Sequence, residues 1–340
     1  MPGWDAINIA LEPLYADEEP LHWGTVVRWR MGGPDPLDGV SAYRAPGPPP
    51  HWHYVSYGLS ELYAKESDDL EVSGWGMELT FRLVREPDDK QAPLWPVSLM
   101  QNLARYIFES GNVLGVGDHL DLNGPIALEQ QTDIRALAFA EDEQLRTIDT
   151  PHGSLTFVQI VGLTMDEYEA VQEWDTTKFL EVLRSSEPLL VTDLGRGSIL
   201  ADGPTAERVR DGMARDGSSM AQLNSDELAW VWTDGIVTLS IGATTVPRLL
   251  RMLKGRLPFG HPLVLRSSSA EVWMTPADTF AVHAAGEGDL HIDLPTAEAD
   301  VILASLRPIA TSYPITNDLI IEVRKSVITD QEGREIEVIG

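Results

Sequence analysis

Two periods of apolar residues along the chain predict its first elements. In the stretch WGMELTFRLV every second residue is apolar, at Met77, Leu79, Phe81 and Leu83. Alternation with period two is typical of a strand with one face in the core. In WPVSLMQNLARYIFESGN the apolar residues recur every three or four positions, at Leu99, Leu103, Tyr106 and Ile107. That spacing predicts a helix with one buried face, and taken alone it places Tyr106 in the core.

Capping patterns indicate where helices begin and end. Ser98 and Gln101 have the spacing of a capping box, and Gly111 stands where a left-handed residue commonly ends a helix. Thr164 and Glu167 repeat the capping-box spacing before a second helix. Further helices are expected at 176–186, 204–217 and 295–308.

Short apolar runs between these helices predict strands and a division of the chain. The candidates are TVVRWRM, HYVSYGL, LTFVQIVGL and PLLVTDL, then IVTLSIG, HPLVLRS, AEVWMTP, TFAVHAA, LHIDLP and LIIEVRKSVI. A chain of 340 residues is too long for one comfortable core. The polar stretch 215–235, rich in Gly, Ser, Asn and Asp, is the expected seam. We therefore expect an α+β protein with two domains, 1–228 and 229–340, each a mixed or antiparallel sheet packed with helices.

Charge and composition narrow the class of partner. With 25 Lys and Arg against 53 Asp and Glu, the net charge is −28, and there is no cysteine. A chain this acidic is expected to repel nucleic acid and anionic membranes and to meet a basic partner quickly, although acidity also simply aids solubility. The sequence has no apolar run of about 18 residues and no signal-peptide pattern at its start. We expect a cytoplasmic protein.

His51 and His53 form the strongest candidate for metal chemistry. On a strand these two positions face the same side, so both imidazoles could bind one ion, with Asp118 and His119 as further ligands. A metal-dependent hydrolase would follow from such a site. The competing interpretation is structural: two half-buried histidines with hydrogen-bonded rings beside Trp52. This second interpretation is favoured, and it implies no metal.

Other motifs give no sign of a cofactor. The run MGGPDPLDGV lacks the Lys-Ser/Thr of a phosphate loop, and Pro34 and Pro36 remove amide groups that a phosphate would need. The runs LGRGS and GVGDH lack dinucleotide-binding spacing, and no Gly-x-Ser-x-Gly elbow occurs. We expect neither a cofactor nor an active site.

Several long blocks resemble one known family. They are GGPDPLDGVSAYR, HWHYVSYGLSELY, GWGMELTFRLVRE, LWPVSLMQNLARYIF, GDHL, TPHGSLTFVQIVGLTMDEYEAVQEW and VTDLGRGSI. In this order they resemble the Suppressor of fused family, from about residue 11 to about residue 235. The remainder is similar only faintly, chiefly at LKGRLPFGH. The resemblance implies a non-enzymatic, two-domain binding protein that clamps a partner peptide between its domains as an added strand.

The resemblance also implies which residues contact the partner. They are Tyr106, Asp118, Glu141, Leu223 and Arg248. Asp118 would contact a basic side chain of the partner, and Leu223 lies in the segment that would pair with the peptide. Arg248 stands where the animal members carry an apolar contact. Because of this difference, the chain is not expected to share their specificity for Gli-type partners. The absence of the long acidic insert of the animal members makes the chain similar to bacterial members, which are linked to immunity against toxins.

Three functions therefore stay open at this point. The first is a protein-binding module of Suppressor of fused type, acting as an immunity or sequestering protein against a partner such as a basic toxin. The second is the metal-dependent hydrolase at His51 and His53. The third is a nucleic-acid mimic that occupies a basic groove through charge alone.

Overall fold

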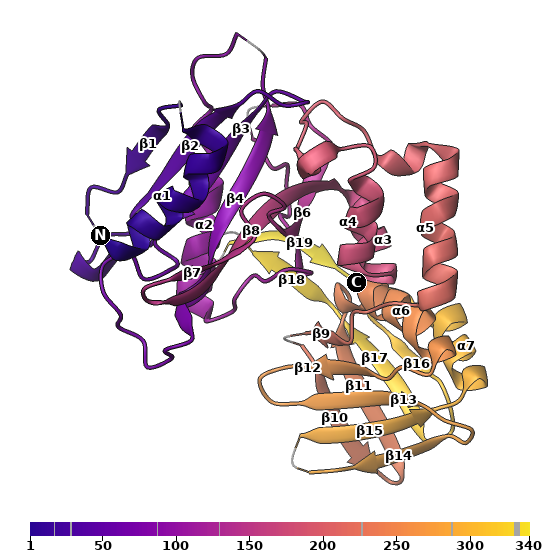
Figure 1. Cartoon of the computed structure of the whole chain (residues 1–340). Helices are drawn as coiled ribbons and strands as arrows, with labels where there is room; N and C mark the ends of the chain where they lie inside the picture. The colour runs from indigo at the N-terminus through magenta and orange to yellow at the C-terminus, as the bar shows by residue number, and fades with distance from the viewer. Residues whose placement is uncertain are drawn as a thin grey trace. The chain divides into compact units, whose positions relative to one another are not determined.

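The chain folds into two compact units of mixed helices and strands (Figure 1). The computed structural model describes residues 1–16, 18–27, 29–86, 88–128, 130–225, 227–286, 288–329 and 334–340. The first unit comprises Met1–Val171 and Thr176–Ala206, and the second comprises Gln172–Asp175 and Glu207–Gly340. The α+β class expected from the sequence is confirmed. The expected boundary between residues 228 and 229 falls inside the second unit, and it stays a prediction of where an independently folding fragment would begin.

The first unit is built on one mixed sheet. Its strands, in spatial order, are β1 (Leu21–Gly24), β2 (Gly39–Ala45), β3 (His51–Tyr57), β4 (Val72–Val84), β8 (Gly153–Thr164), β6 (Ile134–Glu141) and β5 (His119–Asp121). A further strand, β7 (Thr147–Thr150), pairs with β8. Neighbouring strands are antiparallel except β4 and β8, which run parallel. Strands β1 and β5 are thus the two ends of the sheet along this path.

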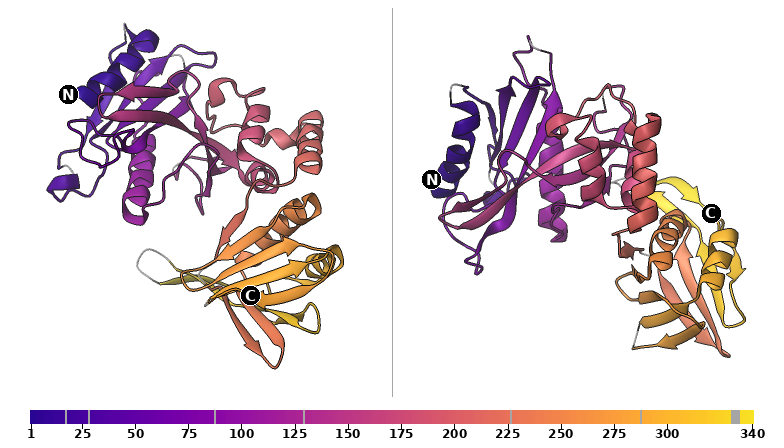
Figure 2. Two further views of the ribbon diagram at one scale, coloured as in Figure 1. Left: turned by 60° about the horizontal axis from the view of Figure 1, so that its bottom comes forward. Right: turned by 45° about the vertical axis from the view of Figure 1, so that its right-hand side comes forward.

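Helices cover both faces of this sheet (Figure 2). On one face, Ile7 and Leu11 of α1 (Pro2–Tyr15) pack in a cluster with Tyr57. On the other, Leu103 of α2 (Trp95–Ser110) packs in a cluster with Phe81. The central strands are therefore buried on both sides, since each residue of β3 is buried whichever face it points to. The other helices within residues 1–216 are α3 (Met165–Glu173), α4 (Thr176–Leu183), α5 (Gly203–Asp216), η1 (Trp29–Met31), η2 (Pro188–Leu190) and η3 (Ile199–Ala201). Most of α5 belongs to the second unit.

The start of α2 differs from the expectation. The helix begins at Trp95, three residues before the expected cap at Ser98, with a proline in its first turn, where the missing amide hydrogen costs nothing. Gln101 makes no capping box; its side-chain amide donates to the carbonyl of Leu37 and accepts from the Leu37 amide, each at 3.2 Å. The C-terminal prediction is confirmed, because Gly111 has the left-handed φ of 73°. Ahead of α3, Glu167 accepts the Thr164 amide at 3.0 Å, as the second capping box predicts.

The second unit contains two larger sheets and a hairpin. The five-stranded sheet has the order β14 (Ala281–Ala284), β15 (Asp289–Leu294), β13 (Glu271–Pro276), β12 (Leu263–Arg266) and β9 (Gln222–Asn224). The four-stranded sheet has the order β10 (Ala229–Thr233), β11 (Ile236–Gly242), β17 (Leu319–Arg324) and β16 (Ser312–Pro314). Strands β18 (Ser326–Thr329) and β19 (Glu335–Ile339) form the hairpin, and the helices are α6 (Thr245–Arg256), α7 (Thr296–Ser305) and η4 (Leu257–Phe259).

One hydrophobic core joins both sheets of the second unit to α6 and α7. Leu239 and Leu265 are completely buried in it, one from each sheet, together with Leu249 of α6 and Ile302 of α7. Neither α1 nor α6 is among the helices predicted from the sequence; α1 has a proline near each end, and α6 has one near its start. Across the described ranges, no helix combines the length and the hydrophobicity needed to cross a membrane.

Candidate functional site

Strand β5 and the turn before it position the first candidate residue, Asp118. The Asp118 carbonyl accepts the Phe139 amide at 3.0 Å, which fixes the turn against β6. Its carboxylate is exposed, and Oδ2 accepts the Gly115 amide at 2.7 Å. The backbone thus holds this carboxylate on the surface at the edge of the sheet. The expectation that Asp118 can meet a partner requires such exposure.

Glu141 lies at the same end of the β5–β6 ladder. It is the last residue of β6, two positions after the Phe139 that pairs with Asp118, and its side chain is exposed. Its Oε1 accepts the Thr147 hydroxyl at 3.2 Å. Glu141 also borders a cavity of about 390 Å³, which is lined by Val116, Phe139, Ala140, Glu141, Glu143, Arg146, Thr177, Leu180, Glu181 and Arg184. The structure therefore brings the two predicted carboxylates to one region of the first unit, beside a concave surface.

Tyr106 is not in the core, so the expectation drawn from helix periodicity alone was wrong. Its side chain is 40% exposed, while Leu103 and Ile107 on either side are buried. The Tyr106 hydroxyl accepts a hydrogen bond from the side-chain Nδ2 of Asn112 at 3.3 Å. It offers an aromatic ring and a hydroxyl at the surface of α2.

Leu223 anchors strand β9 in the second unit through its side chain, which leaves backbone groups of this strand, and not the Leu223 side chain, for a partner. The side chain is 1% exposed and belongs to the core of this unit. Strand β9 is the last strand of its sheet, paired in parallel only with β12 among the described residues. The Ala221 carbonyl and the Ser225 amide bond to β12. Since backbone groups alternate in direction along a strand, those of Gln222 and Asn224 point to the open edge.

Arg248 is exposed on α6, in the second unit. The Ser225 and Thr245 hydroxyls lie 2.8 Å apart, which places the start of α6 beside the end of β9. Arg248 is three residues further along the same helix. The helix therefore carries a positive charge in the neighbourhood of the open strand, at the position where an apolar contact was expected of the family.

His51 and His53 are scaffold residues, more deeply buried than expected. Both are at most 1% exposed. His51 Nδ1 lies 2.8 Å from the Pro49 carbonyl oxygen, and its Nε2 accepts from Arg82 at 3.0 Å. His53 Nδ1 lies 2.8 Å from the Tyr15 hydroxyl, and its Nε2 is 3.2 Å from Asp142 Oδ2.

The charges around these histidines oppose metal binding. One guanidinium nitrogen of Arg82, Nη2, donates to both carboxylate oxygens of Asp142 at 3.0 Å, in an ion pair buried inside the first unit. Burial, together with the nearby Arg82 charge, lowers the pKa of both His51 and His53 to about 4. The rings are neutral at neutral pH, but protein groups surround their nitrogens. In the described residues, no group of three or more His, Asp or Glu side chains is arranged to hold a metal.

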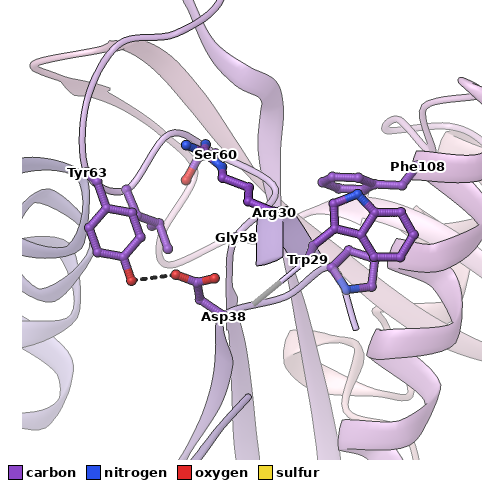
Figure 3. Close-up of a pocket in the computed structure, with 9 residues that line it drawn as sticks. Trp29, Arg30, Asp38, Gly58, Ser60, Tyr63 and Phe108 are labelled. Atoms are coloured by element: carbon purple, nitrogen blue, oxygen red, sulfur yellow. Dashed lines mark hydrogen bonds between the residues drawn. The ribbon is translucent and has the colours of Figure 1, made fainter. Parts of the chain in front are cut away.

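A second cavity, of about 250 Å³, has no counterpart among the sites predicted from the sequence (Figure 3). Trp29 and Phe108 form one wall, edge to face with ring centroids 5.6 Å apart. Tyr63, which donates its hydroxyl hydrogen to Asp38, stands opposite. The lining comes from separate segments of the chain, so no local sequence pattern marks it.

The buried Glu78 carboxylate holds the loop that contributes Gly58 and Ser60 to the lining of this cavity. The backbone amides of Gly58 and Ser60 both donate to Oε1 of the buried Glu78 at 2.9 Å, and the Ser60 hydroxyl donates to the same atom at 2.6 Å. Because a network of this kind fixes the loop, the cavity is a preformed concave surface.

A family model, curated relatives and solved structures all relate this chain to Suppressor of fused proteins. The family model described as Suppressor of fused protein (SUFU) matches residues 33–197. The Suppressor of fused homologs of Homo sapiens and Mus musculus are each 38% identical over 269 residues, covering 73% of this chain. The chain spans 55% of the length of either curated relative.

Solved structures extend the likeness. The crystal structure of Drosophila Suppressor of Fused has a TM-score of 0.77 at 23% identity and covers 95% of this chain and 96% of its own, which shows a shared fold. A chain from the Sufu-Fu complex crystal structure is 34% identical with a TM-score of 0.57, covering 62% of this chain and 96% of its own.

Proposed function

Because this chain belongs to the Suppressor of fused family, we propose that it is a non-enzymatic protein-binding module that takes up a segment of a partner polypeptide as an added β-strand. The relative solved as the Sufu-Fu complex supports a protein partner. The open edge of β9 carries the proposal. Its backbone groups at Gln222 and Asn224 point away from β12, while Leu223 anchors the strand in the core.

In strand addition, different groups determine how tightly a segment binds and which segment binds. Main-chain hydrogen bonds supply affinity for any extended segment, and side-chain contacts select among segments. In the first unit, β5 is likewise the last strand of its sheet. The exposed carboxylates of Asp118 and Glu141 lie by that edge, and Tyr106 adds an exposed aromatic ring. We propose that these three side chains select a basic residue in the same segment, so that the partner is clamped by both units.

The partner proposed is a basic protein. The net charge of −28 favours rapid encounter with a positive surface. A cytoplasmic sequestering or immunity protein that binds a basic toxin, as the likeness to bacterial members suggests, fits this charge. A charge mimic of nucleic acid makes a different prediction: its binding should vanish at high salt and should ignore single substitutions at a strand edge.

A peptide-display experiment tests strand addition directly. Random peptides displayed on phage would be selected on the intact protein, and the affinity of the best synthetic peptides would be measured by fluorescence anisotropy. Asn224→Pro removes an amide hydrogen that faces the open edge, a position where proline is tolerated in an edge strand. We expect it to weaken binding without unfolding the protein.

Charge reversal tests the selecting carboxylate. Asp118→Arg should weaken binding by about 30-fold or more, since losing a desolvated charge pair costs about 2–5 kcal/mol. The matched control is Asp68→Arg, which makes the same charge change at an exposed position away from β5. Affinity that is equal in the wild type, Asn224→Pro and Asp118→Arg would contradict the proposal. If Asp118→Arg and Asp68→Arg lower the peptide affinity equally, the net charge of the protein, and not a contact with Asp118, accounts for the effect. The same variants can then be compared in pull-downs from the native host.

A further inference from the structure

Two histidines meet on the solvent-facing side of the five-stranded sheet of the second unit. His283 in β14 and His291 in β15 are direct partners in the antiparallel pairing of these strands. Opposed residues project to the same face of a sheet, and the two ring centroids are 5.5 Å apart. His283 is exposed and His291 partly exposed, whereas the neighbouring Leu290 and Ile292 point into the core.

The His291 ring is held in place by a supported neighbour. It stacks on Trp273 of β13, its partner in the parallel pairing, with centroids 6.0 Å apart. The Trp273 indole donates to Glu271 Oε1 at 2.6 Å, and the guanidinium of Arg266 donates to Glu271 Oε2 at 2.7 Å. A contact series therefore runs from β12 to β14 and limits how far the His291 ring can turn.

The spacing of the two imidazoles matches that of a pair bound to one ion. With metal–nitrogen bonds of ~2.1 Å, two imidazoles on a tetrahedral or square metal have ring centroids ~5 Å apart. The observed 5.5 Å is reached from this by a small rotation of the exposed His283 ring. We propose that His283 and His291 form a binding site for a divalent transition-metal ion, with Cu²⁺ bound most tightly because imidazole sites follow the Irving–Williams order.

The surroundings favour a cation and leave the site open. Asp289 and Asp293 lie two residues before and after His291 on the same strand, so their side chains project to the same face. Among the described residues no third side chain completes a metal-binding group, so water fills the other coordination positions. An ion held by two protein ligands can accept a further ligand from outside. This arrangement is the reverse of His51 and His53, whose nitrogens are enclosed by Arg82 and other protein groups.

The proposal is tested with copper alone. Protein purified without an affinity tag and freed of metal would be titrated with CuCl₂, with calorimetry for stoichiometry and electron paramagnetic resonance for the ligand set. The wild type should bind one equivalent with a two-nitrogen signature. His283→Gln and His291→Gln should each weaken binding by more than about tenfold, because even groups that only support a metal ligand typically contribute that much. His261→Gln, at a lone exposed histidine of the same unit, is the control and should bind as the wild type does.

Because both histidines are at least partly exposed, the substitutions should leave the fold intact, which circular dichroism checks. The proposal is overturned if the wild type binds no stoichiometric copper. It is equally overturned if the two-nitrogen signal persists in both His283→Gln and His291→Gln. The peptide affinities measured for Asp118→Arg and Asn224→Pro do not enter this test, so it can fail or succeed independently of partner binding.

Discussion

Lowering the pH should destabilise the first unit through two buried histidines. In the unfolded chain, His51 and His53 take up protons near their ordinary pKa of 6.5, whereas burial and the Arg82 charge lower the pKa of each to about 4 in the folded protein. Protons therefore bind the unfolded state preferentially between these values. The stability contributed by the neutral rings is complete above pH 6.5 and declines as the pH falls towards 4.

The size of this effect follows from the two values. Each unit of pKa difference corresponds to 1.36 kcal/mol, so at pH 5.0 each histidine lowers the free energy of unfolding by ~2 kcal/mol relative to pH 7.5. The two together should lower it by ~4 kcal/mol, a large fraction of the stability of a typical domain. Acidic groups with lowered pKa, such as Glu61, at about 2, act only at lower pH. The lowered pKa of His22 adds to the loss of stability, whereas burial raises the pKa of Glu78, which opposes it.

Urea unfolding at pH 7.5 and 5.0 measures the effect, and a substitution assigns it. His53→Gln should lower stability at pH 7.5, because the contact with Tyr15 is altered, but it should reduce the loss between the two pH values by ~2 kcal/mol. His261→Gln, which changes an exposed histidine, should leave that loss unchanged. If the wild type and His53→Gln lose the same stability between pH 7.5 and 5.0, the buried ring is not neutral and the reasoning is refuted.

Three further substitutions test the framework by chemical denaturation. Glu78→Ala should cost about 3 kcal/mol, because it leaves buried hydroxyl and amide donors without an acceptor; a loss below 1 kcal/mol would argue against this role. Arg196→Ala should cost about 3–5 kcal/mol, because it leaves the completely buried Glu167 carboxylate, which Arg196 binds through two nitrogens, without its ion-pair partner. Arg196→Lys should recover part of this stability; if it recovers none, the loss comes from packing rather than from the missing charge. Gly111→Ala should cost about 1 kcal/mol because of its left-handed φ alone, since nothing lies within 4 Å of the added carbon; no measurable change would contradict that.

The sequence predicts elements well where one face of a segment meets one core, and less well where distant residues take part. The alternation in β4 correctly identified its apolar face, with Leu79 and Phe81 completely buried. It could not show that Glu78 and Arg82 on the other face are equally buried, because their partners come from β3 and from Asp142, far along the chain. Similarly, the sequence indicates that the His53 ring is hydrogen-bonded, but it does not show that the partners are Tyr15 and Asp142.

The candidate site illustrates the same limit. Asp118, Glu141 and Leu223 were predicted as partner contacts through resemblance, because no local pattern marks an open strand edge. Tyr106 has the spacing of a core residue, yet it is exposed, since α2 buries a narrower face than the apolar pattern suggests. The pairing of His283 with His291 needed the register of two strands, which the sequence does not contain.

The parallel pairing of β4 with β8 has a consequence for the protein during its synthesis. Strand β4 ends at Val84, but the strand that completes its pairing ends only at Thr164. At translation rates of roughly 5–20 residues per second, the ribosome needs about 4–16 seconds to make the intervening chain. For that time the future centre of the sheet is an apolar strand without its second neighbour, so nascent chains should be most prone to misassociation, and most dependent on chaperones, in this interval.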